Sequence, residues 1–301
     1  MAENTTTESW SNAEWASLEN IALNTDHIKL NFEEHLRKIE EAAPIRGRAY
    51  HKEVILPFEQ IYWPQSLIDL TLEFSCKFCT IDQLSKIFNC DRDNDSLRVT
   101  EDEATEIMKS ITGGITSKSF VKMSSRSPKD YLSGSWNSDV PVPINGVESD
   151  REIVEAFRGS IRTLEDFISY YWWLGRDAVT HIVVRPFVDI DPRNEFRALY
   201  RDGELLGVTQ YRYMDVFDYT DTELESIKAG IYDLLSKFES NVIPELTDEQ
   251  KNCTLDIVKV GDEWKIVELN ILGLSDPCLY DDFDFSIPFK VNLPTDEEVE
   301  E

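Results

Sequence analysis

Apolar residues recur at two different spacings along the chain, and these spacings predict where helices and strands lie. Spacings of three and four residues are typical of helices with one buried face, and they predict helices at 32–41, 66–74, 81–88, 101–111, 151–158, 163–174 and 221–240. Apolar or alternating runs are typical of strands, and they occur at 119–123, 180–186, 195–201, 204–211 and 255–270. Strand pairs followed by packed helices predict an α+β fold, in which an antiparallel sheet carries the functional site.

The same pattern divides the chain into four expected parts. Residues 1–25 are polar and residues 291–301 are acidic, so both ends are expected to be flexible. Residues 26–175 are expected to hold a helical N-terminal part and a smaller subdomain. Residues 176–290 are expected to form the core subdomain.

The charge of the chain limits the kinds of partner it can bind. The 58 acidic residues outnumber the 30 Lys and Arg residues and give a net charge of −28. Binding to nucleic acid requires a basic face, so a nucleic-acid partner is not expected. A protein partner is expected to present a basic surface. No apolar run reaches the length of a membrane span and nothing resembles a signal peptide, so we expect a cytoplasmic protein without a membrane partner.

Two spacings resemble metal sites, but each is incomplete. Cys76 and Cys79 form a single Cys-x-x-Cys pair among five cysteines, and without a second pair they are better interpreted as buried helical cysteines. Residues 91–102 begin like a calcium loop, but Ser96 stands where the turn requires Gly, which favours a solvated acidic linker. None of the four histidines is close in sequence to a recognisable nucleophile, so none is assigned a catalytic role.

Residues 255–270 are the most informative stretch because they predict a hairpin with three polar residues on one face. A loop of three residues, Gly261 to Glu263, predicts that Val260 pairs with Trp264 and that Asp256 lies opposite Glu268. The two-residue period of a strand places Asn270 on the same face as Glu268. Two carboxylates and one carboxamide are hard oxygen donors that suit Mg²⁺. A surface hairpin with one solvated face is the alternative.

Cationic residues upstream favour the metal interpretation, because they suit a phosphate-bearing ligand. An Asp202-Gly203 turn predicts a second hairpin, in which Arg197 faces Val208 and Glu195 faces Gln210. Arg185 follows a buried strand, where an Arg usually meets an anion or an ion partner.

A loop after the strand at 119–123 carries three more cations, Lys122, Arg126 and Lys129, beside hydroxyl groups. This composition suggests a flap over phosphates. Pairing of the same cations with nearby carboxylates is the alternative.

Together these motifs resemble the cell division cycle protein 123 family over roughly residues 115–285. The family's Lys-x-x-x-(Ser/Ala)-x-Pro-Lys-Asp loop is similar to residues 122–130. Its later motifs are similar to residues 184–187, 195–197 and 207–210, and to Asp256 with residues 267–270. Glu268 stands where the family has Asp, which preserves the ligand chemistry.

The resemblance implies an ATP-grasp fold, in which two α+β subdomains clasp ATP with Mg²⁺. It implies that Asp256, Glu268 and Asn270 hold Mg²⁺. It implies that Lys122 touches the α- and β-phosphates, that Arg185 and Arg197 meet the phosphate chain, and that the backbone of 183–187 binds adenine. The remaining nucleotide-binding positions that it implies are Ser124, Arg126, Lys129, Asp130, Val184, Pro186, Phe187 and Gln210.

For function, the resemblance implies an ATP-dependent assembly chaperone for eukaryotic translation initiation factor two, with the gamma subunit of that factor as partner. The alternative is an ATP-grasp ligase that forms an amide or peptide bond through an acyl-phosphate intermediate. A ligase needs an open acceptor pocket beside the γ-phosphate, and the sequence identifies none.

Overall fold

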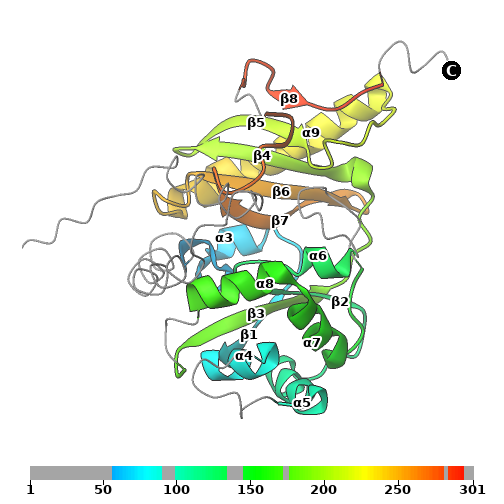
Figure 1. Ribbon diagram of the computed structural model, residues 1–301. Helices are drawn as coiled ribbons and strands as arrows, with labels where there is room; N and C mark the ends of the chain where they lie inside the picture. Colours follow the sequence, from blue (N-terminus) through cyan, green and yellow to red (C-terminus); the bar gives the residue numbers. More distant parts are fainter. Residues whose placement is uncertain (1–55, 90–98, 134–144, 172–175, 281–283, 295–301) are drawn as a thin grey trace, which may run out of the picture. The chain divides into compact units, whose positions relative to one another are not determined.

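Two sheets organise the described part of the chain (Figure 1). In the computed structural model, the described residues are 56–89, 99–133, 145–171, 176–280 and 284–294. The chain divides into two compact units, residues 1–46 and 47–301, and every described residue belongs to the second. Several predicted features lie outside the described residues: the flexible N-terminus, the helix at 32–41, most of the calcium-like segment and most of the acidic tail.

The three-stranded sheet consists of β1 (Ser75–Thr80), β2 (Ser119–Met123) and β3 (Val179–Pro186), with β3 in the centre and antiparallel to both neighbours. Alternate apolar positions of the strands, such as Val121, Met123 and Ile182, pack against helices. These helices are α4 (Ile81–Phe88), α5 (Glu101–Thr112), α7 (Asp150–Gly159) and α8 (Ile161–Asp166), which continues into the π-helical turn η6 (Phe167–Tyr171). Because side chains alternate along a strand, Lys122 and Arg185 point to the other face.

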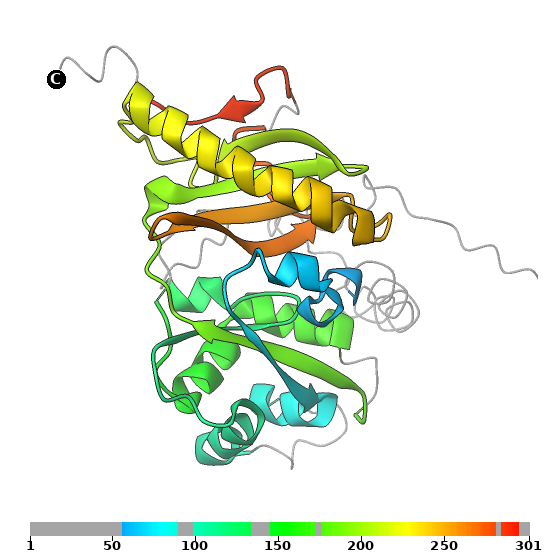
Figure 2. The ribbon, with the colours of Figure 1, turned by 180° about the vertical axis from the view of Figure 1, so that it is seen from behind.

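The five-stranded sheet has the order β7-β6-β4-β5-β8. Its strands are β4 (Glu195–Arg201), β5 (Glu204–Gln210), β6 (Cys253–Val260), β7 (Glu263–Ile271) and the short β8 (Phe289–Lys290), which is parallel to β5. The long helix α9 (Asp221–Lys237) lies across one face (Figure 2) and packs its buried residues on Phe196, Ala198, Leu255 and Ile257. The residues between these strand positions, including Arg197 and Asp256, therefore face away from α9.

Short elements connect these layers. They are η3 (Leu56–Phe58), η4 (Gln60–Tyr62), α3 (Gln65–Ile68), α6 (Lys129–Leu132), η8 (Pro192–Asn194), η9 (Phe238–Val242), η10 (Ile243–Glu245) and η11 (Cys278–Tyr280). No helix within the described ranges is both long enough and apolar enough to cross a membrane.

Capping residues explain where three of the helices begin. A threonine stands before each of α4, α5 and α9, and its side chain accepts a hydrogen bond from the backbone three residues later. The side chain at that later position, Gln83, Glu103 or Glu223, accepts one from the threonine backbone in return. This capping box satisfies backbone N–H groups that would otherwise lack partners at a helix start.

The α+β class predicted from the sequence is confirmed, but some predicted elements are wrong. The helix expected at 66–74 is reduced to α3, and Cys76 and Cys79 lie in strand β1 rather than in a helix. Three positions apart on a strand, the two cysteines point to opposite faces of the sheet, so they cannot share a ligand. Strand β3 pairs with β1 and β2, so the change from one sheet to the other falls within 187–194, later than the expected boundary at 175/176.

Both predicted hairpins are present, but bulges alter their registers. In β6–β7 the turn has two residues, Val260 pairs with Glu263, and an irregularity next to Ile257 then restores the predicted pair of Asp256 and Glu268. A bulge inserts one extra residue on one strand, which shifts every later pair by one.

In β4–β5 the Asp202-Gly203 turn is confirmed, with φ angles of 51° and 82°. A shift next to Leu199 places Arg197 opposite Thr209 rather than Val208. For the same reason Gln210 pairs with Phe196 rather than with Glu195.

Candidate functional site

The residues expected to bind nucleotide and metal gather where the polar faces of the two sheets meet. Lys122 of β2 donates from Nζ to Oε1 of Glu268 on β7, over a distance of 2.9 Å. Both side chains are buried, with 5% and 12% of their surface exposed. A residue predicted to contact phosphate and a residue predicted to bind metal are therefore neighbours, although 146 positions separate them in the sequence.

The five-stranded sheet supplies the rest of the expected metal ligands. Arg197 donates from Nε to Oδ1 of Asp256 over 2.7 Å and from Nη2 to Oδ2 over 3.1 Å. Its third nitrogen, Nη1, donates to the carbonyl oxygen of Asp276 over 2.6 Å. Asn270 lies beside Glu268, with 3.4 Å between its Nδ2 and Oε2 of that carboxylate. The predicted ligands Asp256, Glu268 and Asn270 thus form one continuous group.

Two more expected cations approach this group from the three-stranded sheet and its flap. Arg185 donates from Nη1 to the carbonyl oxygen of Val267 over 3.3 Å, and its guanidinium lies 4.3 Å from the ring centre of Phe120. Lys129, at the start of α6, donates from Nζ to the hydroxyl of Tyr211 over 2.9 Å. Together with Lys122 and Arg197, these residues place four cations around two carboxylates.

The electrostatics of the group follow from burial combined with opposite charge. Burial acts to raise the pKa of Glu268, but Lys122, Lys129 and Arg185 outweigh it and hold that pKa well below its usual range. Burial lowers the pKa of Arg185. It acts in the same sense on Arg197, but Asp256 outweighs it, so the pKa of Arg197 lies above its usual range. The carboxylates and the cations stabilise each other's charged forms.

Several residues of the expected nucleotide site make structural contacts. Asp130 accepts hydrogen bonds from the Ser160 hydroxyl and from the backbone N–H groups of Ile161 and Arg162, so it caps α8. Gln210 is fully buried and donates from Nε2 to the carbonyl oxygens of Arg212 and Asp215. Asp130 therefore fixes the start of a helix, and Gln210 fixes the loop after β5.

The other expected positions divide between the core and the rim. Val184 packs with the helices of the three-stranded sheet, and Ser124 forms hydrogen bonds in a buried polar cluster. Arg126 pairs with Asp166 over 3.3 Å, and Phe187 lies under the ammonium group of Lys118 at 4.2 Å. Pro186 ends β3. Strand β3 pairs with β1 only as far as Val184 and with β2 as far as Pro186, so hydrogen bonds to adenine would compete with both neighbouring strands at 183–184 but with β2 alone at 185–186.

Sequence reasoning missed two residues of the group, Tyr211 and Glu195. Tyr211 accepts the hydrogen bond of Lys129, and its ring centre lies 4.8 Å from the guanidinium carbon of Arg197. Glu195 shares a strand face with Arg197, and burial raises its pKa to about 7 against the effect of Lys129. Strand alternation from Arg197 would have identified Glu195, but Tyr211 follows the end of β5 and carries no such signal.

The donor set fits a magnesium ion bound together with phosphates better than a metal site made of protein alone. Within the described ranges, no three His, Cys, Asp or Glu side chains lie close enough to hold a metal ion. Two carboxylates and an amide leave coordination positions for phosphate oxygens and water, as Mg²⁺ prefers. The cations that neutralise Glu268 and Asp256 are also suited to phosphates. Phosphates could therefore replace the carboxylates as partners of the cations, and a metal ion could replace the cations as partner of the carboxylates.

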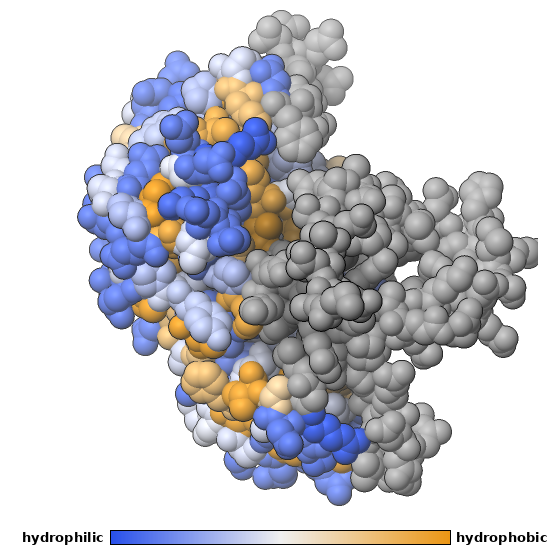
Figure 3. All heavy atoms as spheres, turned by 90° about the vertical axis from the view of Figure 1, so that its left-hand side faces the viewer, coloured by the Kyte–Doolittle hydropathy of each residue, from blue (hydrophilic) through white to orange (hydrophobic). Residues whose placement is uncertain are grey.

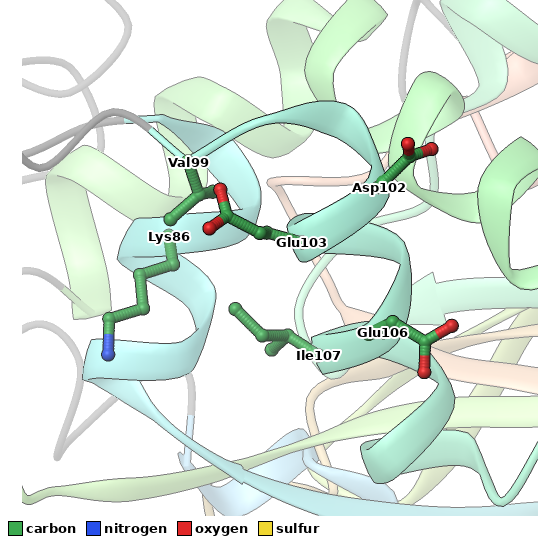
Figure 4. A pocket seen from close by; sticks show the side chains of 6 residues that line it. All are labelled: Lys86, Val99, Asp102, Glu103, Glu106 and Ile107. Carbon is green, nitrogen blue, oxygen red and sulfur yellow. The ribbon is translucent and has the colours of Figure 1, made fainter.

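A hollow of about 500 Å³ lies elsewhere, between α4 and α5 (Figure 4). Its lining is Lys86, Val99, Asp102, Glu103, Glu106 and Ile107. Three carboxylates and one lysine do not form a phosphate site, so the hollow is not the candidate site.

Comparison with known proteins shows a family match over part of the chain and a likeness of fold over most of it. The model of the D123 family matches residues 174–286. No curated protein sequence matches the chain. The solved structure of Cdc123 from Schizosaccharomyces pombe is similar, with a TM-score of 0.56 and 15% identity, covering 81% of this chain and 98% of that one. A C-terminally truncated form of the same protein gives a TM-score of 0.58 and 16% identity over the same shares.

The family match contains Arg185, Arg197 and all three expected metal ligands, whereas Lys122 and Lys129 lie before it. The likeness of fold extends beyond the matched segment, because it covers most of both chains. The D123 family model therefore matches part of the chain, residues 174–286, and the chain has an ATP-grasp-like fold similar to that of Cdc123.

Proposed function

We propose that the protein binds ATP with Mg²⁺ between the polar faces of its two sheets. The observation that carries this proposal is the buried contact of Lys122 with Glu268, which joins a predicted phosphate ligand to a predicted metal ligand. Buried charges at such a position are costly unless they are paired or serve a ligand. A site in which a metal ion and phosphates replace these internal ion pairs explains why the buried lysine and the buried carboxylate are both present.

In this proposal the cations and the oxygen ligands divide the nucleotide between them. Lys122, Arg185 and Arg197 meet the phosphates, and Lys129 joins them from the flap. Asp256, Glu268 and Asn270 hold Mg²⁺, which neutralises phosphate charge. The adenine lies along 183–187, toward the end of β3 where the chain leaves the three-stranded sheet.

For the role of the bound nucleotide, we favour protein assembly in the cytoplasm. Cdc123 of Schizosaccharomyces pombe shares the fold, and the family resemblance points to the gamma subunit of translation initiation factor two as the partner. The net charge of −28 favours a partner with a basic surface. On the face in Figure 3, hydrophilic side chains cover most of the described surface, with smaller hydrophobic areas among them.

Isothermal titration with ATP tests the nucleotide proposal, carried out with Mg²⁺ and again with a chelator. We expect binding with Mg²⁺ and much weaker binding without it, because phosphate charge then faces Asp256 and Glu268 directly. The absence of binding under both conditions would overturn the proposal. Co-purification with a translation-factor subunit tests the assembly role, and ADP release that depends on an added amino acid would favour the ligase alternative.

A further inference from the structure

Glu59 is a buried acidic residue that the proposed nucleotide site does not use. It lies between η3 and η4, and 3% of its surface is exposed. Its Oε1 accepts a hydrogen bond from the Ser124 hydroxyl over 2.8 Å and one from the Tyr171 hydroxyl over 3.1 Å. A buried carboxylate that receives two hydroxyl donors occupies a formed binding position rather than a chance contact.

A third donor beside Glu59 has no partner. Both ring nitrogens of the buried His181 lack a hydrogen bond to any described residue, and its Nδ1 lies 3.8 Å from Oε2 of Glu59. The positive charge of Lys122 also acts on Glu59. Two hydroxyls, one imidazole and a nearby ammonium group are the set of groups that recognises a carboxylate.

The segment that carries Glu59 is attached to the other sheet. Trp63 and Phe58 pack in the core of the five-stranded sheet, and the Trp63 indole donates to the carbonyl oxygen of Phe58 over 3.0 Å. Gln250 donates from its side chain to the carbonyl oxygen of Pro57. In both ribbon views the blue segment before α3 lies where the two sheets meet (Figures 1 and 2). Glu59 therefore reaches from the core of one sheet to residues of the other.

Strand register places this carboxylate at one end of the proposed nucleotide site. Lys122 pairs with Val183, and His181 lies two residues before Val183 on the same face of β3. Arg185 lies two residues after Val183, toward the linker at 187–194. Along this face the order is Arg185, then Lys122, then His181 with Glu59. Glu59 is thus on the far side of Lys122 from the expected adenine position.

We propose that the buried position beyond Lys122 is a carboxylate-binding site that Glu59 of the same chain fills. Its position relative to the nucleotide rests on the proposed function, whereas the carboxylate site itself rests on the contacts of Glu59. A ligase would place the carboxylate of its substrate at this end, next to the γ-phosphate. Because Glu59 fills the position, the protein binds nucleotide without accepting an external carboxylate.

The test removes the internal carboxylate and supplies a free one. In the full chain, Glu59→Gly removes the carboxylate to which Ser124 and Tyr171 donate and which lies 3.8 Å from His181, and acetate is small enough to replace it. We expect the midpoint of thermal unfolding of Glu59→Gly to rise by several degrees in sodium acetate, compared with sodium chloride of equal ionic strength. The wild type and Glu59→Gln should show no such rise, because a side chain already fills the site.

An equal response to acetate in all three proteins would overturn the proposal. If Glu59→Gly does not fold, Glu59→Ala takes its place with the same expectation. Independently, ADP release by the wild type is measured with added acetate and glycine, and carboxylate-dependent release would also overturn the proposal. If titration shows that ATP does not bind, the proposed function fails, and the acetate experiment still decides whether the carboxylate site exists.

Discussion

Arg197 holds both carboxylate oxygens of Asp256 from the neighbouring strand, over 2.7 and 3.1 Å. The two residues are direct partners in the β4–β6 register, and the next partner of Asp256, on β7, is Glu268. Lys122 in turn pairs with Glu268 from the other sheet. The groups expected to meet phosphate and those expected to meet metal therefore neutralise each other when no nucleotide is bound.

Removing the carboxylate of Asp256 should destabilise the protein strongly. Asp256→Ala leaves the guanidinium of Arg197 buried without its carboxylate partner, which typically costs about 3–5 kcal/mol. Urea unfolding followed by circular dichroism measures the loss. The double variant with Arg197→Met and Asp256→Leu removes both charges and should recover most of the stability. If Asp256→Ala alone unfolds like the wild type, the pair is not stabilising in the way its geometry indicates.

The sequence predicted which residues of the two hairpins form the site, but not how the strands align. The pairing of Asp256 with Glu268 was predicted from a three-residue loop, whereas the structure reaches it through a two-residue turn and a bulge. The wrong loop length and the unpredicted bulge each shift the register by one residue, in opposite directions, so they cancel at Asp256. In β4–β5 the turn was correct and a bulge still moved Arg197 by one partner. Bulges depend on packing from outside the hairpin, such as that of Tyr280, whose hydroxyl lies where a side chain on Gly207 would have to go.

Long-range contacts explain what the sequence missed. Glu59 lies 65 positions from Ser124 and 112 from Tyr171, and no spacing links them in the sequence. Conversely, Asp130 and Gln210 belong to the motifs that suggested nucleotide binding, and their polar atoms hold a helix start and a loop. A motif includes residues that shape a site as well as residues that contact the ligand, and only their contacts distinguish the two.

Lys122 should contribute more to nucleotide affinity than a lysine elsewhere on the molecule. Lys122→Met removes a buried ammonium group that would otherwise contact phosphate, and a hydrogen bond to a charged group is worth about 1.5–3 kcal/mol. We therefore expect the affinity for ATP with Mg²⁺ to fall about tenfold or more in a calorimetric titration. Lys237→Met, on the exposed side of α9, is the matched control and should bind as the wild type does. Equal losses in both variants would exclude a specific role for Lys122.

His181 should make the folded protein sensitive to mild acid. Burial, helped by the charge of Lys122, lowers the pKa of His181 from 6.5 to about 4. Between these values the unfolded chain binds the proton and the folded protein does not, so the free energy of unfolding falls as the pH decreases from 6.5 to 4. The contribution of this group is about 3 kcal/mol at most.

The variant His181→Gln isolates this effect from that of the other titrating groups. Its unfolding free energy should fall less than that of the wild type over the same pH window, as measured by urea unfolding at several pH values. Parallel curves for the two proteins would show that His181 takes up its proton normally in the folded state.

The neighbouring residues Lys129 and Asp130 should have separable effects, although both belong to one sequence motif. Asp130 accepts three hydrogen bonds at the start of α8, so Asp130→Ala should cost about 1–3 kcal/mol of unfolding free energy. Its carboxylate contacts none of the predicted nucleotide ligands, so the ATP affinity of the folded variant should stay within about twofold of the wild type. Lys129→Met should lower the ATP affinity, because the ammonium group of Lys129 points to Tyr211 beside Arg197. It should change the unfolding free energy little, because the apolar stem of the side chain is preserved. Urea unfolding and ATP titration of both variants test the separation, and a loss of affinity in Asp130→Ala as large as that in Lys129→Met would mean that the whole motif contacts the nucleotide.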